Sequence, residues 1–223
     1  MIKKCNTNIA WIFEKSLIEY PCAVKKMELI VADIIAHKGL QTIWTLEHAP
    51  VYTAGISAQE HDLLQSSTIP IYKTNRGGKF TYHGPGMKII YVMLDLKDLF
   101  YPQPPDIARF VEFLELWMIN VLAQFSIAAE IKKGRVGMWV NTNDGEKKIG
   151  AIGIKIKKWV SYHGIALNID PNLANFANIV PCGLKEFGVT SFADLGIKKF
   201  DEKFFHETLI AEFDKLKAVF FKK

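Results

Sequence analysis

The sequence predicts an α+β fold in which helices flank a mixed or antiparallel sheet. Two stretches, 22–37 and 107–125, carry apolar residues at helical spacing, whereas apolar residues recur at every second position in much of the chain after 135. Helices and strands follow one another irregularly rather than as repeated strand–helix–strand units, which favours α+β. A length of 223 residues, 49% of them hydrophobic, fits one domain over residues 1–223.

The first part of the chain combines short strands with one helix. Residues 9–13 have the composition of a strand, and the apolar positions of 22–37 form one helical face that ends near Gly39. Residues 42–46 (TIWTL) are β-branched and aromatic, as is typical of a strand. The next stretch, 51–64, contains small polar residues and is predicted to be a loop, either a surface connection or one wall of a pocket.

Residues 76–96 combine a glycine-rich polar loop with a buried strand. The loop, RGGKFTYHGPGM, contains four glycines and a proline, which exclude a helix, and 88–96 has the composition of a core strand. Glycine lets the backbone approach a ligand closely, and polar side chains stand between these glycines. We therefore predict a binding loop on the sheet. A tight turn with solvated charges is the alternative, but it does not explain the interspersed Thr, Tyr and His.

The second part of the chain is predicted to place helices on both sides of a strand-rich region. Two prolines and Asp106 form a helix start, and 107–125 carries a broad apolar stripe that we interpret as core. Residues 135–170 alternate around an Asp-Gly turn and predict sheet strands. Residues 201–223 have one apolar face, with acids early and lysines late as the macrodipole favours, so we expect a docking helix.

Composition and charge narrow the classes of function. The three cysteines lack metal-like spacing, so neither disulfides nor a metal site are indicated, and a reducing cytoplasm is expected. The lysines at the start precede no apolar run, and glutamates interrupt the longest apolar helical pattern, so we expect no membrane association. A net charge of +5 suits an acidic partner, but the lysines are scattered without interleaved aromatic residues, which argues against nucleic acid.

Cys182 is the candidate nucleophile. It lies in IVPCGL, between a proline and a glycine that predict a tight bend. Cysteine attacks as the thiolate, and Lys148, just before a glycine-rich strand segment, would stabilise that charge and relay protons. His83 and His163 are further candidates for the partner. A small buried cysteine and a solvated lysine would explain the same residues, and spacing alone does not decide between these interpretations.

Four motifs occur in order along the chain: RGGKFTYHGPG with YVMLDL, then KKIGAIGIKI, then YHGIALNID, then PCGL. Together they resemble the octanoyltransferase family, the lipoyl(octanoyl) transferases of lipoate synthesis. LEHAPVYTAG upstream and GVTSFADLG downstream are similar to that family as well, so the resemblance covers most of the chain. It implies the α+β fold of biotin and lipoate protein ligase catalytic domains, in which a sheet and its loops enclose an acyl-binding tunnel.

The resemblance also implies roles for individual residues. Cys182 corresponds to the acyl-accepting nucleophile, and Lys148 to the lysine that makes its thiol more acidic. The implied substrate-binding residues form three segments: Arg76, Gly77, Gly78, Lys79, Phe80, Thr81, Tyr82 and His83; Ala151, Ile152 and Gly153; and Gly164, Ile165 and Ala166. Three positions depart from the family pattern: Met87 replaces Gln, Gly150 replaces Ala, and Met138 replaces Val.

The implied reaction is a two-step acyl transfer that uses neither ATP nor a metal ion. The Cys182 thiolate attacks the octanoyl thioester of acyl carrier protein, and the lysine amine of a lipoyl domain then attacks octanoyl-Cys182, with Lys148 handling the protons. The implied acceptors are lipoyl domains of 2-oxoacid dehydrogenase E2 subunits and the glycine cleavage H protein, and a monomer is expected. The positive charge fits steering of an acidic acyl carrier protein. An ATP-dependent lipoate or biotin ligase and a non-catalytic binding module remain alternatives.

Overall fold

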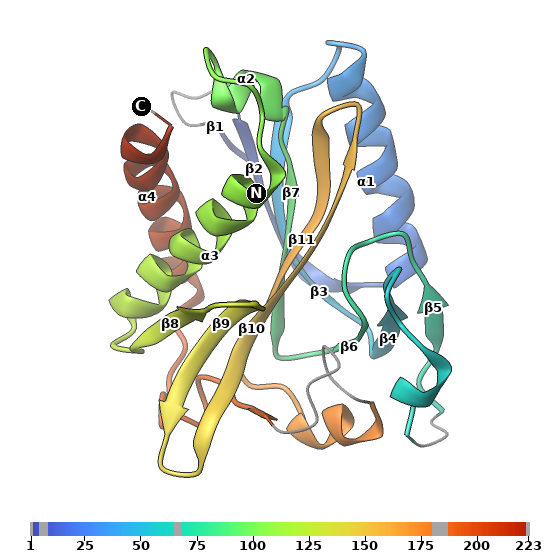
Figure 1. Ribbon diagram of the computed structural model, residues 1–223, viewed down its shortest axis with the longest axis vertical. Coiled ribbons are helices and arrows are strands. Elements are labelled where there is room, and N and C mark those ends of the chain that lie inside the picture. The colour runs from blue at the N-terminus through green and yellow to red at the C-terminus, as the bar shows by residue number, and fades with distance from the viewer. Residues whose placement is uncertain (1, 5–8, 65–67, 180–186, 222–223) are drawn as a thin grey trace.

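The computed structural model describes residues 2–4, 9–64, 68–179 and 187–221, and it contains a large mixed sheet and a small one (Figure 1). In spatial order the large sheet consists of β1 (Ile2–Lys4), β2 (Ile9–Ile18), β3 (Gln41–His48), β7 (Met87–Met93), β11 (Val160–Asn168), β10 (Gly145–Lys157), β9 (Arg135–Thr142) and β8 (Ala129–Lys132), with β12 (Gly188–Val189) also paired to β10. The small sheet has the order β5 (Ile71–Lys73), β4 (Val51–Ala54) and β6 (Phe80–His83). Most neighbouring strands are antiparallel, but β2 and β3, β10 and β12, and β4 and β5 are parallel.

Helices cover both faces of the large sheet (Figure 1). The helix α1 (Tyr20–Ile35) packs on one face, whereas α3 (Ile107–Gln124) and α4 (Glu202–Phe220) pack together on the other. The chain also forms the short α2 (Leu96–Phe100) and two 3₁₀ turns, η1 (Glu60–Asp62) and η2 (Leu173–Asn178). Among the described residues, no helix combines the length and apolar character needed to cross a bilayer. This arrangement confirms the predicted α+β fold with a mixed sheet and flanking helices.

Side chains of the central strands point alternately to the two faces of the large sheet and belong to two separate hydrophobic cores. On β3, Ile43 belongs to the core beneath α3 and α4, and Trp44 belongs to the core beneath α1. On β7, Ile90 and Tyr91 divide in the same way. The α1-side core continues under the small sheet, where Tyr52 is fully buried. The space between the two sheets is therefore apolar on several sides, and the site described below lies there.

The helix boundaries follow local chemistry. The α1 helix begins two residues earlier than predicted, because Pro21 suits the first turn of a helix. Asp106 caps α3 by accepting a hydrogen bond from the Arg109 amide, and Asp201 caps α4 through the Phe204 amide. Trp117 and other residues of the predicted α3 stripe are fully buried, which confirms their interpretation as core.

Two predicted loops contain strands. Residues 51–54 form β4 rather than a loop, and residues 80–83, within the predicted glycine-rich loop, form β6. The two strands pair in antiparallel register, with Tyr52 opposite Tyr82. Each is only four residues long, so the periodicity that identifies a strand is too short to detect, and the pairing supplies the stability. The loop prediction was therefore wrong for both segments, although 76–79 remains irregular.

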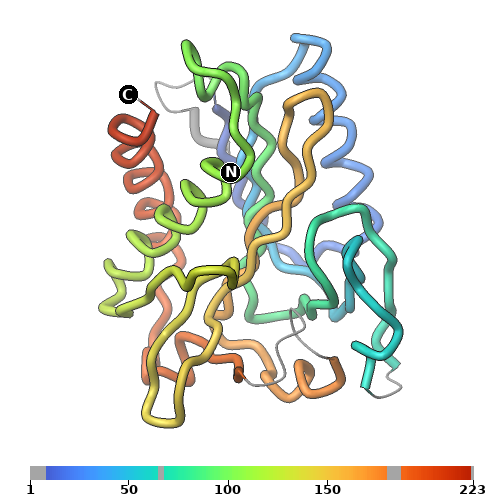
Figure 2. Tube along the Cα trace, in the orientation of Figure 1, coloured from blue at the N-terminus to red at the C-terminus, as the bar shows by residue number. Residues whose placement is uncertain are grey.

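A long hairpin of β10 and β11 crosses the molecule (Figure 2). Residues of both strands line the cavity described below. Its two-residue turn, Lys158 and Trp159, has φ of 51° and 69° at these residues. Positive φ at both central residues is the geometry that matches the twist of an antiparallel pair. The hairpin places Ala151 opposite Ala166 and Gly153 opposite Gly164, so two of the predicted binding segments lie side by side.

Candidate active site

A cavity of about 220 Å³ lies between the small sheet and the α1-side face of the large sheet. It is lined by Tyr20, Arg76, Gly78, Lys79, Phe80, Thr81, His83, Ile89, Tyr91, Gly134, Arg135, Val136, Lys148, Ala151, Ile152, Gly153, His163, Gly164, Ile165 and Ala166. The glycines and alanines of β10 and β11 leave the wall without bulk, which suits a slender, flexible chain. Arg76, His83 and His163 add polar groups to the lining of the cavity.

The structure brings the predicted binding residues together, with two exceptions. All of them except Gly77 and Tyr82 line the cavity, as does Lys148. The amide of Gly77 donates to the Ile154 carbonyl at 2.9 Å, so this residue anchors the loop to β10. The Tyr82 ring instead packs edge-on against Phe176, 5.6 Å away between centroids. We therefore keep substrate contact as a prediction for the lining residues and assign Gly77 and Tyr82 supporting positions.

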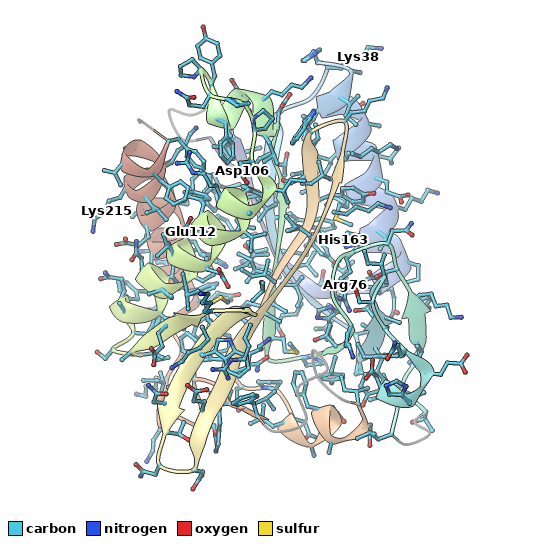
Figure 3. The ribbon with its side chains drawn as sticks, viewed as in Figure 1. Lys38, Arg76, Asp106, Glu112, His163 and Lys215 are labelled. Atoms are coloured by element: carbon cyan, nitrogen blue, oxygen red, sulfur yellow. The ribbon has the colours of Figure 1, made fainter. Side chains whose placement is uncertain are left out.

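Arg76 organises the loop that borders the cavity. Its side chain is buried, and its guanidinium donates to the Thr53 carbonyl and hydroxyl, both at 2.7 Å, and to the Gly77 and Lys79 carbonyls, both at 2.9 Å. A planar fork of donors can hold several acceptors at once in fixed geometry. Figure 3 shows Arg76 below His163, in the region between β11 and the small sheet. Arg76 therefore shapes this wall by joining the loop to β4.

Lys148 projects from β10 into the cavity wall. It is buried, and its Nζ donates to the Val136 carbonyl at 3.0 Å and lies 4.7 Å from the centroid of the Trp139 ring. The neighbouring strand approaches closely because Gly137 adopts a φ of 121°, and a Cβ there would lie 2.6 Å from the Gly150 carbonyl oxygen. The Nζ atom of Lys148 is thus held at a fixed place by a carbonyl and an aromatic face.

Cys182, the predicted nucleophile, lies outside the described residues. Described residues on both sides of its segment nevertheless lie near Lys148. Phe176 and Val189 line a small hollow of about 20 Å³ together with Lys148 and Met87. Val189 is also the strand partner of Lys148 in the parallel pair of β10 and β12. Described residues before and after the segment of Cys182 therefore border the same small hollow as Lys148.

Histidine and tyrosine side chains form a buried polar cluster in and beside the cavity. His48 Nδ1 lies 2.7 Å from the Ile18 carbonyl, which only accepts, so this nitrogen carries the proton. His48 Nε2 then accepts a hydrogen bond from the Tyr91 hydroxyl, also at 2.7 Å. The Nδ1 atom of His83 is buried and has no hydrogen-bond partner among the described residues, and the His83 ring lies 5.8 Å from the ring of His48.

Burial keeps these histidines neutral. It lowers the pKa of His48 to about 4 and, together with the charge of Arg76, the pKa of His163 to about 3. Burial, His48 and Arg76 hold the pKa of His83 well below 6.5, and burial raises the pKa of Tyr91 well above 10. At neutral pH the imidazoles therefore carry no charge, while the Tyr91 phenol keeps its proton as a donor to His48.

Acidification is expected to destabilise the protein through these buried histidines. The unfolded chain takes up a proton at His48 near pH 6.5, but the folded protein does so only near pH 4. The contribution of neutral His48 to the free energy of unfolding is therefore fully present above pH 6.5. It is lost as the pH drops toward 4, and the loss amounts to about 3 kcal/mol. Urea unfolding measured at intervals across this pH range checks the expectation.

His48→Gln isolates the contribution of His48 to this acid dependence. An amide preserves one donor and one acceptor but does not titrate, so the free energy of unfolding of the variant should change less between pH 6.5 and 4 than that of the parent. His61→Gln is the matched control, since the His61 side chain is 71% exposed, and its curve should run parallel to that of the parent. A His48→Gln curve that also runs parallel to the parent would contradict the assignment.

Several lining residues were not predicted. Ile89 and Tyr91 belong to the predicted strand 88–96, and its period of two places them on one face, so a face analysis would have found them. Tyr20 precedes the helix that was predicted, and no sequence signal indicates its position. Gly134, Arg135 and Val136 follow β8, a strand that was not predicted. Their position next to Lys148 results from tertiary packing, which the local sequence does not indicate.

The fold is that of the ligases that attach lipoate and biotin to proteins. A lipoate-protein ligase A bound with ATP superposes with a TM-score of 0.66 and 14% identity, over 93% of this chain and 85% of the other. The Aquifex aeolicus biotin protein ligase superposes with a TM-score of 0.59 and 14% identity, over 96% and 72%. At such identities the likeness concerns the fold alone.

Sequence comparison defines the family. Residues 19–214 match the lipoyl protein ligase A/B catalytic domain, and this chain belongs to that family. A relative from Wolbachia pipientis wMel, named octanoyltransferase, is 50% identical over 84% of this chain and 90% of its own length. An octanoyltransferase from Bartonella henselae is 46% identical over 86% of this chain and 80% of its own length.

Proposed function

We propose that this protein transfers an octanoyl group from octanoyl-acyl carrier protein to the lysine of lipoyl domains. The observation that carries the proposal is a buried lysine, Lys148, in the wall of a narrow cavity next to both flanks of the Cys182 segment. Relatives with 46–50% identity that are named octanoyltransferase support the same reaction, and they make a ligase less favoured. A non-catalytic module would have no need of such a lysine.

The proposed chemistry proceeds in two balanced steps. The Lys148 amine accepts the thiol proton of Cys182, and the thiolate attacks the octanoyl thioester. The bond between the acyl carbon and the carrier sulfur then breaks, and Lys148 returns the proton to the departing carrier thiolate. A lipoyl-domain amine then attacks octanoyl-Cys182, and the amide forms as the amine proton is transferred and the thiol of Cys182 is restored. In this proposal Arg76, Gly78, Lys79, Phe80, Thr81 and His83 border the acyl chain on one side, and Ala151, Ile152, Gly153, Gly164, Ile165 and Ala166 border it on the other.

Neither ATP nor a metal ion takes part in the proposed reaction, because the thioester is already activated. Proposed acceptors are lipoyl domains of E2 subunits and the glycine cleavage H protein, and we propose a monomeric cytoplasmic enzyme. The net charge of +5 supports encounter with an acidic acyl carrier protein. Steering of this kind is screened by salt, so transfer at low carrier concentration should slow as ionic strength rises.

Intact-mass spectrometry tests the covalent intermediate. The protein is incubated with octanoyl-acyl carrier protein alone, and we expect one added octanoyl group that disappears when apo lipoyl domain is supplied. Cys182→Ser should form no labile adduct, while Cys22→Ser is the matched control, because Cys22 is exposed and should not affect the adduct. Transfer that requires ATP and proceeds without any adduct would overturn the proposal in favour of a ligase.

A further inference from the structure

The α3 helix carries a carboxylate on its buried side. Glu115 is 6% exposed, and its neighbours Leu114, Trp117 and Met118 are fully buried members of the α3–α4-side core. A carboxylate in such surroundings is costly unless it is hydrogen-bonded. Glu115 Oε1 accepts a hydrogen bond from the Gly137 amide at 2.8 Å. The mechanism proposed above gives this residue no role.

One peptide group joins Glu115 to Lys148. The amide N–H of Gly137 donates to Glu115, and the carbonyl of the same peptide unit, that of Val136, accepts from Lys148 Nζ at 3.0 Å. Because the peptide is planar and its N–H and C=O point in opposite directions, an anion at one end and a cation at the other both align with its dipole. Each charge therefore strengthens the hydrogen bond made by the other.

We propose that Glu115 is a positioning residue that acts on Lys148 through the Val136–Gly137 peptide. The carboxylate fixes the orientation of this peptide, so the Val136 carbonyl stays directed at Lys148 Nζ. The consequence for acyl transfer rests on the proposed function, in which Lys148 takes the thiol proton of Cys182. A fixed position of Nζ keeps Lys148 in place for that proton transfer.

The charges around Glu115 are consistent with this arrangement. Burial raises the pKa of the Glu115 carboxyl, as does the nearby Glu112, whereas the Gly137 amide and the Lys148 charge lower it. Among the described residues, Glu112 on the same helix and Lys148 on β10 are the charged groups that act on Glu115. Glu112 is exposed, so Lys148 is the buried counter-charge.

The test compares Glu115→Gln with Glu112→Gln. Glutamine keeps an oxygen for the Gly137 amide but removes the charge, so the whole pH profile of octanoyl transfer should move to lower pH by about half a unit or more. Glu112→Gln removes the same charge from an exposed position one turn earlier and should move the profile by much less. A purely structural role would leave the Glu115→Gln profile in place.

Nuclear magnetic resonance supplies a readout that does not depend on activity. In the unsubstituted protein, the Gly137 amide resonance should titrate with the Glu115 carboxyl, and this step should vanish in Glu115→Gln. At one fixed pH, the Lys148 Cε resonance should differ in chemical shift between Glu115→Gln and the parent, because the Val136 carbonyl is no longer held in its orientation by a charged partner. If the protein transferred no octanoyl group but both shifts were seen, the proposed function would fail and the coupling would stand. An unmoved Lys148 Cε resonance, or a Gly137 amide insensitive to pH, would overturn the inference.

Discussion

Lys148→Met is expected to slow octanoyl transfer by about 100- to 10,000-fold, the range typical of a lost general acid–base group. Methionine keeps an apolar side chain beside Trp139 but cannot donate to the Val136 carbonyl or exchange protons. The Val136 carbonyl then loses its partner and Glu115 loses its buried counter-charge, so the free energy of unfolding should fall by about 1–3 kcal/mol, and the protein should remain folded. Single-turnover formation of octanoyl-enzyme, followed by mass, measures the effect directly.

Lys147→Met is the matched control for this prediction. Lys147 is adjacent in sequence, but its ammonium pairs with the largely exposed Asp144 at 3.2 Å, and such a surface ion pair contributes little. Its transfer rate should stay within about threefold of the parent, a change of under 1 kcal/mol in the barrier. If Lys148→Met showed the same small change, Lys148 would be a packing residue, and another group would have to take the thiol proton.

The residues that the sequence motifs singled out lie together in the structure, whereas part of the backbone that carries them was not predicted. The three binding segments could be proposed because each motif residue is matched to the family pattern at its own position, without knowledge of the fold. Most of these residues line one cavity. The small sheet could not be predicted, since β4 and β6 are short and pair across a long loop. Most residues of both segments favour strands individually, but segments of four residues are stable as strands only when they pair, as β4 and β6 do.

The role of Arg76 shows why partners across the fold escape prediction. An arginine next to two glycines in a polar loop indicates ligand binding equally well whether its donors face a substrate or the protein. In the structure these donors are directed to Thr53 and to carbonyls of its own loop. Nothing near Arg76 in the sequence identifies Thr53 as a partner. In the sequence, Glu115 is likewise only one of the glutamates that interrupt the apolar pattern of a helix. Such contacts follow from packing.

Gly164→Ala is expected to cost about 3–5 kcal/mol of the free energy of unfolding, which is a large part of the stability of an ordinary domain. A Cβ at this position would lie 2.0 Å from the carbonyl oxygen of Ile90 on the neighbouring strand β7. The obstacle is backbone in the centre of the sheet, so no side-chain rotation relieves it, and β11 would have to move away from β7. Gly164 follows His163, whose φ of 59° already departs from strand geometry, and both residues border the cavity.

Gly188→Ala provides the comparison, because among the described residues the nearest atoms to a Cβ there belong to the flexible side chain of Lys147, at 3.4 Å or more. Its free energy of unfolding should stay within about 0.5 kcal/mol of the parent. Urea denaturation of both variants measures the difference, and octanoyl transfer by any folded Gly164→Ala protein should be reduced because the cavity wall has shifted. A Gly164→Ala protein as stable as Gly188→Ala would mean that β11 and β7 are not packed this closely at Ile90.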